Sequence, residues 1–187
     1  MKKFFAVLLT VIVLCGLTNA QTAYGTKGVW EVGGGLGYTR STEVVESVSG
    51  VSTNEISLMP FVGYFVIDNV QVGLLPDYES VSSGGVALKT FNIFLVPAYY
   101  FVMPTKVKQH PYIRLLGGFS TSSFAGVNTG KGVSGGLGAG VKSNLGDNSL
   151  LNVGIDYIIY TLKPSYVNTR FGHNDIDINI GFAMVLF

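Results

Sequence analysis

Hydrophobic residues alternate with small or polar ones along most of the chain, and Met59–Gly73 shows the pattern most clearly. This stretch reads MPFVGYFVIDNVQVG, with alternation up to Val66, a break at 67–69 and renewed alternation after it. Two runs of period two joined by a few turn residues are typical of a β-hairpin. The stretch 96–112 repeats the arrangement, with a proline shortly before aromatic residues and then a polar turn. The pattern therefore predicts a chain built from antiparallel hairpins.

Followed along the whole chain, the same alternation predicts eight strands, which cover residues 28–39, 55–66, 70–78, 88–102, 111–120, 131–145, 149–161 and 173–187. Short turns are expected at 67–69, 104–110 and 146–148, and longer Ser-, Thr- and Gly-rich loops at 40–54, 79–87, 121–130 and 162–172. An even number of strands, with short turns at one end and longer loops at the other, is typical of an outer-membrane barrel. The predicted strands are also long enough to cross a membrane at a tilt.

The two faces of each predicted strand differ in character. In the last strand, Ile176, Ile178 and Ile180 alternate with Asp175 and Asp177. An eight-stranded barrel has room inside only for packed side chains, so the small and polar face is expected to point inward. A soluble lipocalin-like barrel would have the opposite polarity. The predicted fold class is all-β, an eight-stranded antiparallel up-and-down transmembrane β-barrel.

The N-terminus has the pattern of a cleaved secretory signal peptide. Lys2-Lys3 is followed by an apolar run to Leu17 and by a small residue, Ala20, at the expected cleavage site. The predicted organisation is a signal peptide at 1–20 and a single outer-membrane barrel domain at 21–187.

Composition agrees with this architecture and excludes several classes of function. The chain is 48% hydrophobic and 12% charged, whereas about 25% of residues are charged in soluble domains. The single cysteine, Cys15, lies in the predicted signal peptide, so no disulfide or thiol chemistry is expected in the mature chain. No basic patch supports nucleic-acid binding, and no ligand cluster supports a metal site or a cofactor.

Short motifs and the predicted signal peptide together carry a family resemblance. The motifs are Pro60-x-x-Gly63-Tyr64-Phe65 before Asp68-Asn69, Pro97-x-Tyr99-Tyr100-Phe101, Pro111-Tyr112 and the terminal Phe187. With them, the chain resembles the small outer-membrane β-barrels of Gram-negative bacteria, the OmpA/OmpX/OmpW-like eight-stranded barrels. The resemblance spans residues 21–187. It implies a place in the bacterial outer membrane, contact with its lipids and lipopolysaccharide, and both mature termini in the periplasm.

The resemblance also implies a role for the last residue. In such proteins a C-terminal aromatic residue is the assembly signal that the barrel-assembly machinery recognises, and Phe187 fits this role. Phe187 is out of phase with the apolar residues Phe182, Met184 and Leu186. A bulge or a shift of register in the last strand would reconcile the two.

Isolated charges on the inward face are the candidate functional residues. An unpaired charge inside a barrel is costly, so these side chains are expected to pair. They would then form a structural polar plug or the gate of a narrow pore. The candidates are Glu31, Arg114, Lys142, Asp156 and Asp177.

The expected function is a structural or surface-interaction role in the cell envelope without catalysis. Loops 40–54 and 162–172 are the candidate surface for an extracellular ligand. One alternative is a narrow porin-like channel for small solutes. A second is a lipid A-modifying enzyme that would use His173, Asp175 and Ser165, although no nucleophile-elbow motif is present.

Overall fold

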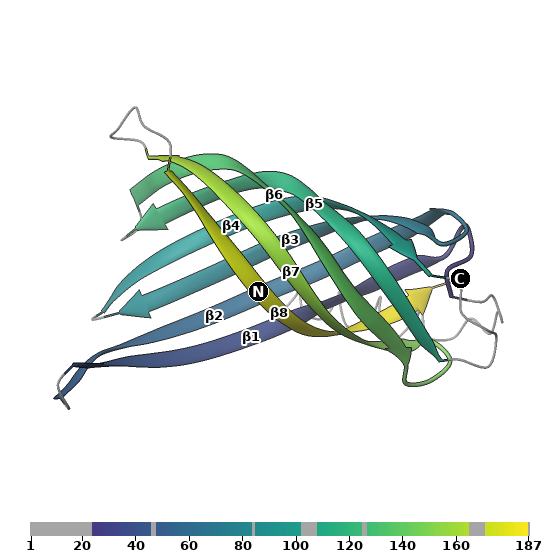
Figure 1. Ribbon diagram of the computed structural model, residues 1–187, viewed down its shortest axis with the longest axis horizontal. Helices are drawn as coiled ribbons and strands as arrows, with labels where there is room; N and C mark the ends of the chain where they lie inside the picture. Colours follow the sequence, from purple (N-terminus) through teal and green to yellow (C-terminus); the bar gives the residue numbers. More distant parts are fainter. Residues whose placement is uncertain are drawn as a thin grey trace, which may run out of the picture.

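The protein is an eight-stranded closed barrel. The structure, a computed structural model, describes residues 24–45, 48–83, 85–101, 108–124, 127–164 and 171–186. The strands lie in chain order, each antiparallel to the next, and β1 pairs with β8 to close the barrel (Figure 1). They are β1 (Trp30–Val45), β2 (Val48–Ile67), β3 (Val70–Ser83), β4 (Val86–Tyr100), β5 (Gln109–Phe124), β6 (Val127–Asn144), β7 (Ser149–Pro164) and β8 (Phe171–Leu186).

The inward and outward faces follow the alternation of the sequence. In β4, Phe94 and Val96 are buried, whereas Phe91 and Leu95 are exposed on the outer surface. The predicted choice of the inward face is confirmed on every strand. Exposed apolar side chains lie on all eight strands, among them Trp30, Leu58, Leu74, Leu95, Leu115, Leu137, Ile155 and Ile178.

The long loops predicted at 40–54, 79–87 and 121–130 are wrong, because the strands continue through most of each stretch. In the first, β1 runs to Val45 and β2 begins at Val48. These stretches are rich in Ser, Thr and Val, and β-branched residues favour extended backbone. Polar composition suggested loops, but pairing with the neighbouring strand keeps the backbone extended.

Two further connections also differ from the prediction. Of the predicted loop 162–172, β7 includes the part up to Pro164 and β8 begins at Phe171. The residues between these two strands lie outside the described part of the chain. Of the predicted turn 104–110, the final two residues belong to β5, which begins at Gln109.

The two ends of the barrel are built differently. At the proximal end, defined as the end where β1 begins and β8 ends, the turn between β2 and β3 contains Asn69 with φ of 64°. The segment 24–29 folds against this turn, since the Asn69 backbone N–H donates to the Gly25 carbonyl at 2.7 Å. Lys27 N–H donates to the Asp68 carboxylate at 2.8 Å. The distal end is the opposite one, where β1 meets β2.

The pairing between β1 and β8 that closes the barrel is short. Trp30–Gly35 pairs with Gly181–Leu186 over six residue pairs, whereas β3 and β4 pair over the full length of Val70–Ser83. Distal to Gly35 and Gly181 the two strands move apart (Figure 1). This gap in the wall is referred to below as the β1–β8 seam.

Candidate lumen site

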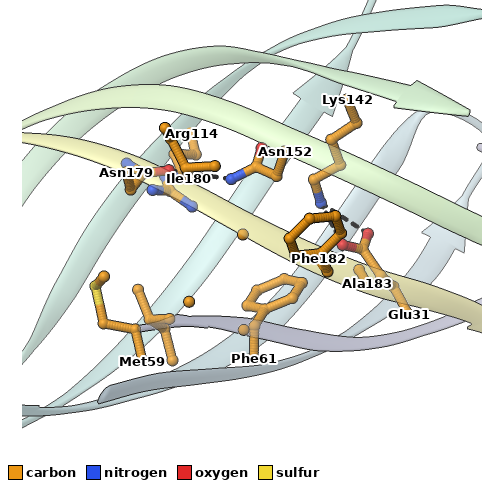
Figure 2. Close-up of a pocket in the computed structure, with 14 residues that line it drawn as sticks. Glu31, Met59, Phe61, Arg114, Lys142, Asn152, Asn179, Ile180, Phe182 and Ala183 are labelled. Carbon is orange, nitrogen blue, oxygen red and sulfur yellow. Dashed lines mark hydrogen bonds and ion pairs between the residues drawn. The ribbon is translucent and has the colours of Figure 1, made fainter. Parts of the chain in front are cut away.

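A buried ion pair occupies the proximal half of the lumen. Lys142 Nζ lies 2.5 and 2.7 Å from the two carboxylate oxygens of Glu31 (Figure 2). Gln71 Nε2 donates to the same carboxylate at 2.9 Å. Tyr100 joins the network by accepting from Lys142 at 2.7 Å and donating to Gln71 at 2.9 Å. These hydrogen bonds offset much of the cost of removing two charges from water.

The segment before β1 completes this network. The Tyr24 hydroxyl donates to Glu31 at 2.8 Å, and its ring packs edge-on against Phe65 and Tyr100. Burial raises the pKa of Tyr24 well above its usual range, with the negative charge of Glu31 as a further cause. The phenol therefore stays protonated and remains a hydrogen-bond donor.

A second ion pair lies next to the first. Arg114 donates from Nε to the Asp156 carboxylate at 2.8 Å and from a terminal nitrogen to its other oxygen. This two-point contact is the geometry that fixes a guanidinium most firmly against a carboxylate. Asn179 Nδ2 also donates to Asp156, at 2.8 Å, and Asn152 donates to Asn179 at 3.0 Å. Tyr112 donates to Asn152 at 2.9 Å and extends the network toward the proximal end.

The structure brings together four of the five predicted site residues. Glu31 and Lys142 form one ion pair, and Arg114 and Asp156 form the other. Asp177 faces the lumen as predicted but takes part in neither pair; it lies opposite Asp156 across β7 and β8. Because both side chains are acidic, Asp156 cannot neutralise Asp177. Asp177 instead belongs to an acidic region of the lumen.

That region is a cavity of about 640 Å³ in the distal half of the barrel. Carboxylates from four strands, β2, β3, β7 and β8, line it, and the described residues that line it include no Lys or Arg. The acidic side chains of the cavity are Glu55, Asp77, Glu79, Asp156, Asp175 and Asp177.

Residues that the sequence prediction did not include complete the site. Gln71, Tyr100, Asn152 and Asn179 are uncharged, so the search for isolated charges passed over them. Their position on the inward face of the alternation is the signal that could have found them. Glu79 was missed for another reason, because its segment was predicted to be a loop and lies in β3.

The other predicted features fall outside these networks. Phe187 and Ser165 lie outside the described residues, and only the backbone of His173 is described. Within the described ranges, no group of His, Cys, Asp or Glu side chains could hold a metal ion. No helix in the described part of the chain is both long and apolar enough to span a membrane.

No protein-family model matches the chain, and no curated protein matches its sequence. Solved structures do match. Neisserial surface protein A aligns with a TM-score of 0.59 at 18% identity, over 84% of this chain and 97% of that one. The N-terminal β-barrel domain of OprF from Pseudomonas aeruginosa aligns with a TM-score of 0.53 at 14% identity, over 86% and 98%.

The outer membrane protein OprG from Pseudomonas aeruginosa aligns with a TM-score of 0.51 at 18% identity, over 86% of this chain and 97% of that one. The chain has the fold of the small outer-membrane β-barrels. The predicted resemblance is confirmed at the level of the fold, and the matches span nearly the full length of each solved barrel.

Proposed function

We propose that this protein spans the outer membrane of a Gram-negative bacterium as a structural or surface-interacting barrel. The observation that carries the proposal is the outer surface, where large apolar side chains are exposed on all eight strands. Leu36, Leu115 and Leu137 expose 79%, 61% and 61% of their surface. Monomeric soluble proteins rarely expose apolar patches of this extent. A closed sheet with an apolar exterior and charged groups inside suits lipid as the surrounding solvent.

The interior supports a non-catalytic role. The two ion pairs and their hydrogen-bonded neighbours fill the proximal half of the lumen, as a plug that stabilises the barrel would. The tight turn at 67–70 and the chain termini would face the periplasm, and the distal hairpins would face the exterior. In this orientation the β1–β2 hairpin is the main candidate for contact with an external partner.

The proposal is tested by membrane fractionation combined with gel mobility before and after heating. A folded outer-membrane barrel is expected in the outer-membrane fraction, with a mobility that changes when boiling unfolds it. Proteolysis of intact cells should cut at the β1–β2 hairpin and leave the turn at 67–70 uncut. Recovery in the soluble fraction with no mobility change would contradict the proposal.

A narrow gated channel is the second candidate. It is favoured by the continuity of the polar lumen, in which the distal cavity leads down to Arg114–Asp156 and then to Glu31–Lys142. Opening would require these pairs to exchange partners, since their side chains occupy the passage.

Single-channel recording in planar bilayers tests the gate. A gated pore should give reproducible steps that Arg114→Ala changes or abolishes, whereas Lys131→Ala, at an exposed lysine, should leave them unaltered. Absence of steps in all three proteins would exclude this candidate.

A lipid A-modifying enzyme is the remaining alternative, and it rests only on the occurrence of His173, Asp175 and Ser165 near one end of the chain. We expect lipid A from cells that overproduce the protein to keep its mass spectrum. A gained or lost acyl chain that disappears in His173→Ala would favour the enzyme.

A further inference from the structure

The distal cavity has the size of a small-molecule site and a lining of two kinds. Its volume is about 640 Å³, within the range of about 300–1,000 Å³ that is typical of ligand pockets. Carboxylates form one part of the lining, and apolar side chains form another. A ligand that fills such a cavity needs groups that match both parts.

Three of the carboxylates form a row on the inner face of β2 and β3, referred to below as the carboxylate row. Asp77 and Glu79 are two residues apart on one face of β3, so their Cβ atoms lie about 7 Å apart. Glu79 pairs with Ser57, and Glu55 is two residues from Ser57 on β2. Glu55 is therefore a diagonal neighbour of Glu79, also at about 7 Å. Neither of the two lumen ion pairs includes a member of this row.

A buried amide beside the carboxylate row has an acceptor without a partner. Asn92 is 1% exposed on the inner face of β4, and its Nδ2 donates to Asp77 at 2.8 Å. It lies two residues from Phe94, and both Phe94 and Asp77 line the cavity. Its Oδ1 is buried and has no hydrogen-bond partner in the described part of the chain. Because buried polar atoms are as a rule hydrogen-bonded, this acceptor indicates a place for a donor such as an ammonium N–H.

The proximal end of the cavity is lined by apolar side chains, referred to below as the apolar cluster. Leu75 lies two residues from Asp77 on the same face of β3 and pairs with Phe94 of β4. Leu116 of β5 and Ile158 of β7 belong to the same buried cluster and also line the cavity. The hydrophobic effect favours the packing of a carbon chain against such a surface.

The arrangement of the carboxylates favours an organic cation over a metal ion. Within the described ranges, no group of three or more His, Cys, Asp or Glu side chains could hold a metal ion. Carboxylates that are spread along two strands beside an apolar surface instead suit a chain with separated positive charges. A linear polyamine has this chemistry, because short methylene chains separate its ammonium groups at intervals similar to those of the carboxylate row.

We propose that the distal cavity binds a linear polyamine. Its ammonium groups lie against Glu55, Glu79 and Asp77, where they relieve the repulsion between these like charges. The ammonium group at Asp77 also donates to Asn92 Oδ1, and the methylene chain packs on the apolar cluster. Asp175 has an interaction of its own and is not part of the proposed site. The inference goes beyond the proposed structural role, because it assigns a small-molecule ligand to the lumen.

The test measures spermidine binding to the full barrel in phosphatidylcholine vesicles by isothermal titration calorimetry. One control ligand is cobalt(III) hexaammine, a compact trication that has the charge of spermidine without its methylene chain. The other is spermidine acetylated at both ends, which keeps the chain but loses the terminal charges. Spermidine should bind saturably and roughly tenfold more tightly than either control.

Substitutions in the carboxylate row test the position of the ligand. Asp77→Asn combined with Glu79→Gln should weaken spermidine binding about tenfold, because two partly exposed ion pairs are lost. Glu79→Gln alone should weaken it about threefold and replaces the double variant if that variant does not fold. Asp147→Asn, in the exposed proximal turn, should leave the affinity unchanged.

Three results would overturn the inference. Equal affinity for cobalt(III) hexaammine would show that the acids attract cations without recognising a polyamine. Unchanged affinity in the variants of the carboxylate row would place the ligand elsewhere, and absence of spermidine binding by the folded barrel would exclude the site. Heat-modifiable mobility of each protein shows that the barrel is folded, so failure of this inference is distinguishable from failure of the barrel proposal.

Discussion

At the residue scale, the proximal half of the lumen depends on two pairs of opposite charges, Glu31 with Lys142 and Arg114 with Asp156. Glu31 and Lys142 are 1% and 4% exposed, so each charge is largely removed from water and lies against its counter-charge. The Lys142 ammonium also lies 5.1 Å from the Phe61 ring centroid and 5.2 Å from that of Tyr100. Such contacts favour a cation over a ring face. Removing one of the two charges should therefore lower the free energy of unfolding more than removing both.

Lys142→Met should lower the free energy of unfolding by ~3–5 kcal/mol, because it leaves the Glu31 carboxylate buried without a cation. Urea unfolding of the folded barrel in vesicles measures this change. Adding Glu31→Gln to Lys142→Met should recover most of the loss. Lys131→Met removes an exposed lysine and should have little effect. A loss that is as large in the double variant as in Lys142→Met would contradict the role of charge pairing.

Gly138→Ala should disturb the second ion pair. A Cβ at Gly138 would overlap the Asp156 carboxylate that Arg114 holds, and we expect a loss of about 1–3 kcal/mol in unfolding free energy from this overpacking. Gly117→Ala is the matched control, because a Cβ there meets nothing within 4 Å. Equal stability of the two variants would show that the lumen accommodates the added methyl group.

At the element scale, the strands extend further than polar composition alone suggested. The hairpin between β1 and β2 joins strands that end at Val45 and begin at Val48, and it pairs along nearly its whole length. Residues that favour turn conformations, rather than polar residues in general, mark the strand ends. The clearest case is Asn69, the only described residue other than glycine with positive φ.

Asn69→Val should destabilise the β2–β3 hairpin by ~1–2 kcal/mol, because a β-branched side chain clashes with the backbone at φ of 64°. Asn69→Gly should be tolerated, since glycine adopts this conformation without a Cβ penalty. Urea unfolding compares the three proteins. If valine proves as stable as asparagine, the left-handed turn is not required for the hairpin.

At the scale of the whole molecule, the barrel has a plugged proximal half, a hollow acidic distal half and a seam on one side. The closing β1–β8 pairing is restricted to six residue pairs, so the distal wall is open on that side. The outer surface remains apolar around the barrel, and this polarity supports the proposed membrane location.

Leu137→Arg should lower the folding yield in vesicles and reduce the free energy of unfolding by ~2–4 kcal/mol, because it would place a charge at the middle of the surface that we propose faces lipid. Phe124→Arg lies at the distal end of β5 and should cost less, since the penalty falls toward the membrane interfaces. Both residues are exposed, at 61% and 50%. Equal and negligible effects would argue that the outer surface faces water.

The alternation of the sequence predicted the strand number, their order and the inward position of all five candidate charges. It did so because a strand turns successive side chains to opposite faces, a local property of the backbone. It failed at the strand ends, where Ser- and Thr-rich segments are extended by pairing with neighbours. It also passed over Gln71 and Asn179, whose importance depends on the charges they meet across the lumen.

The sequence by itself therefore determined the barrel class and which side chains enter the lumen, since both follow from period-two patterning. Only the tertiary structure decided that Lys142 meets Glu31, that Arg114 meets Asp156 and that Asp177 joins neither ion pair. These outcomes depend on strand register and barrel closure, which join residues as far apart in sequence as β1 and β6. The β1–β8 seam is likewise decided only by the tertiary structure, because it arises where the first and last strands stop pairing.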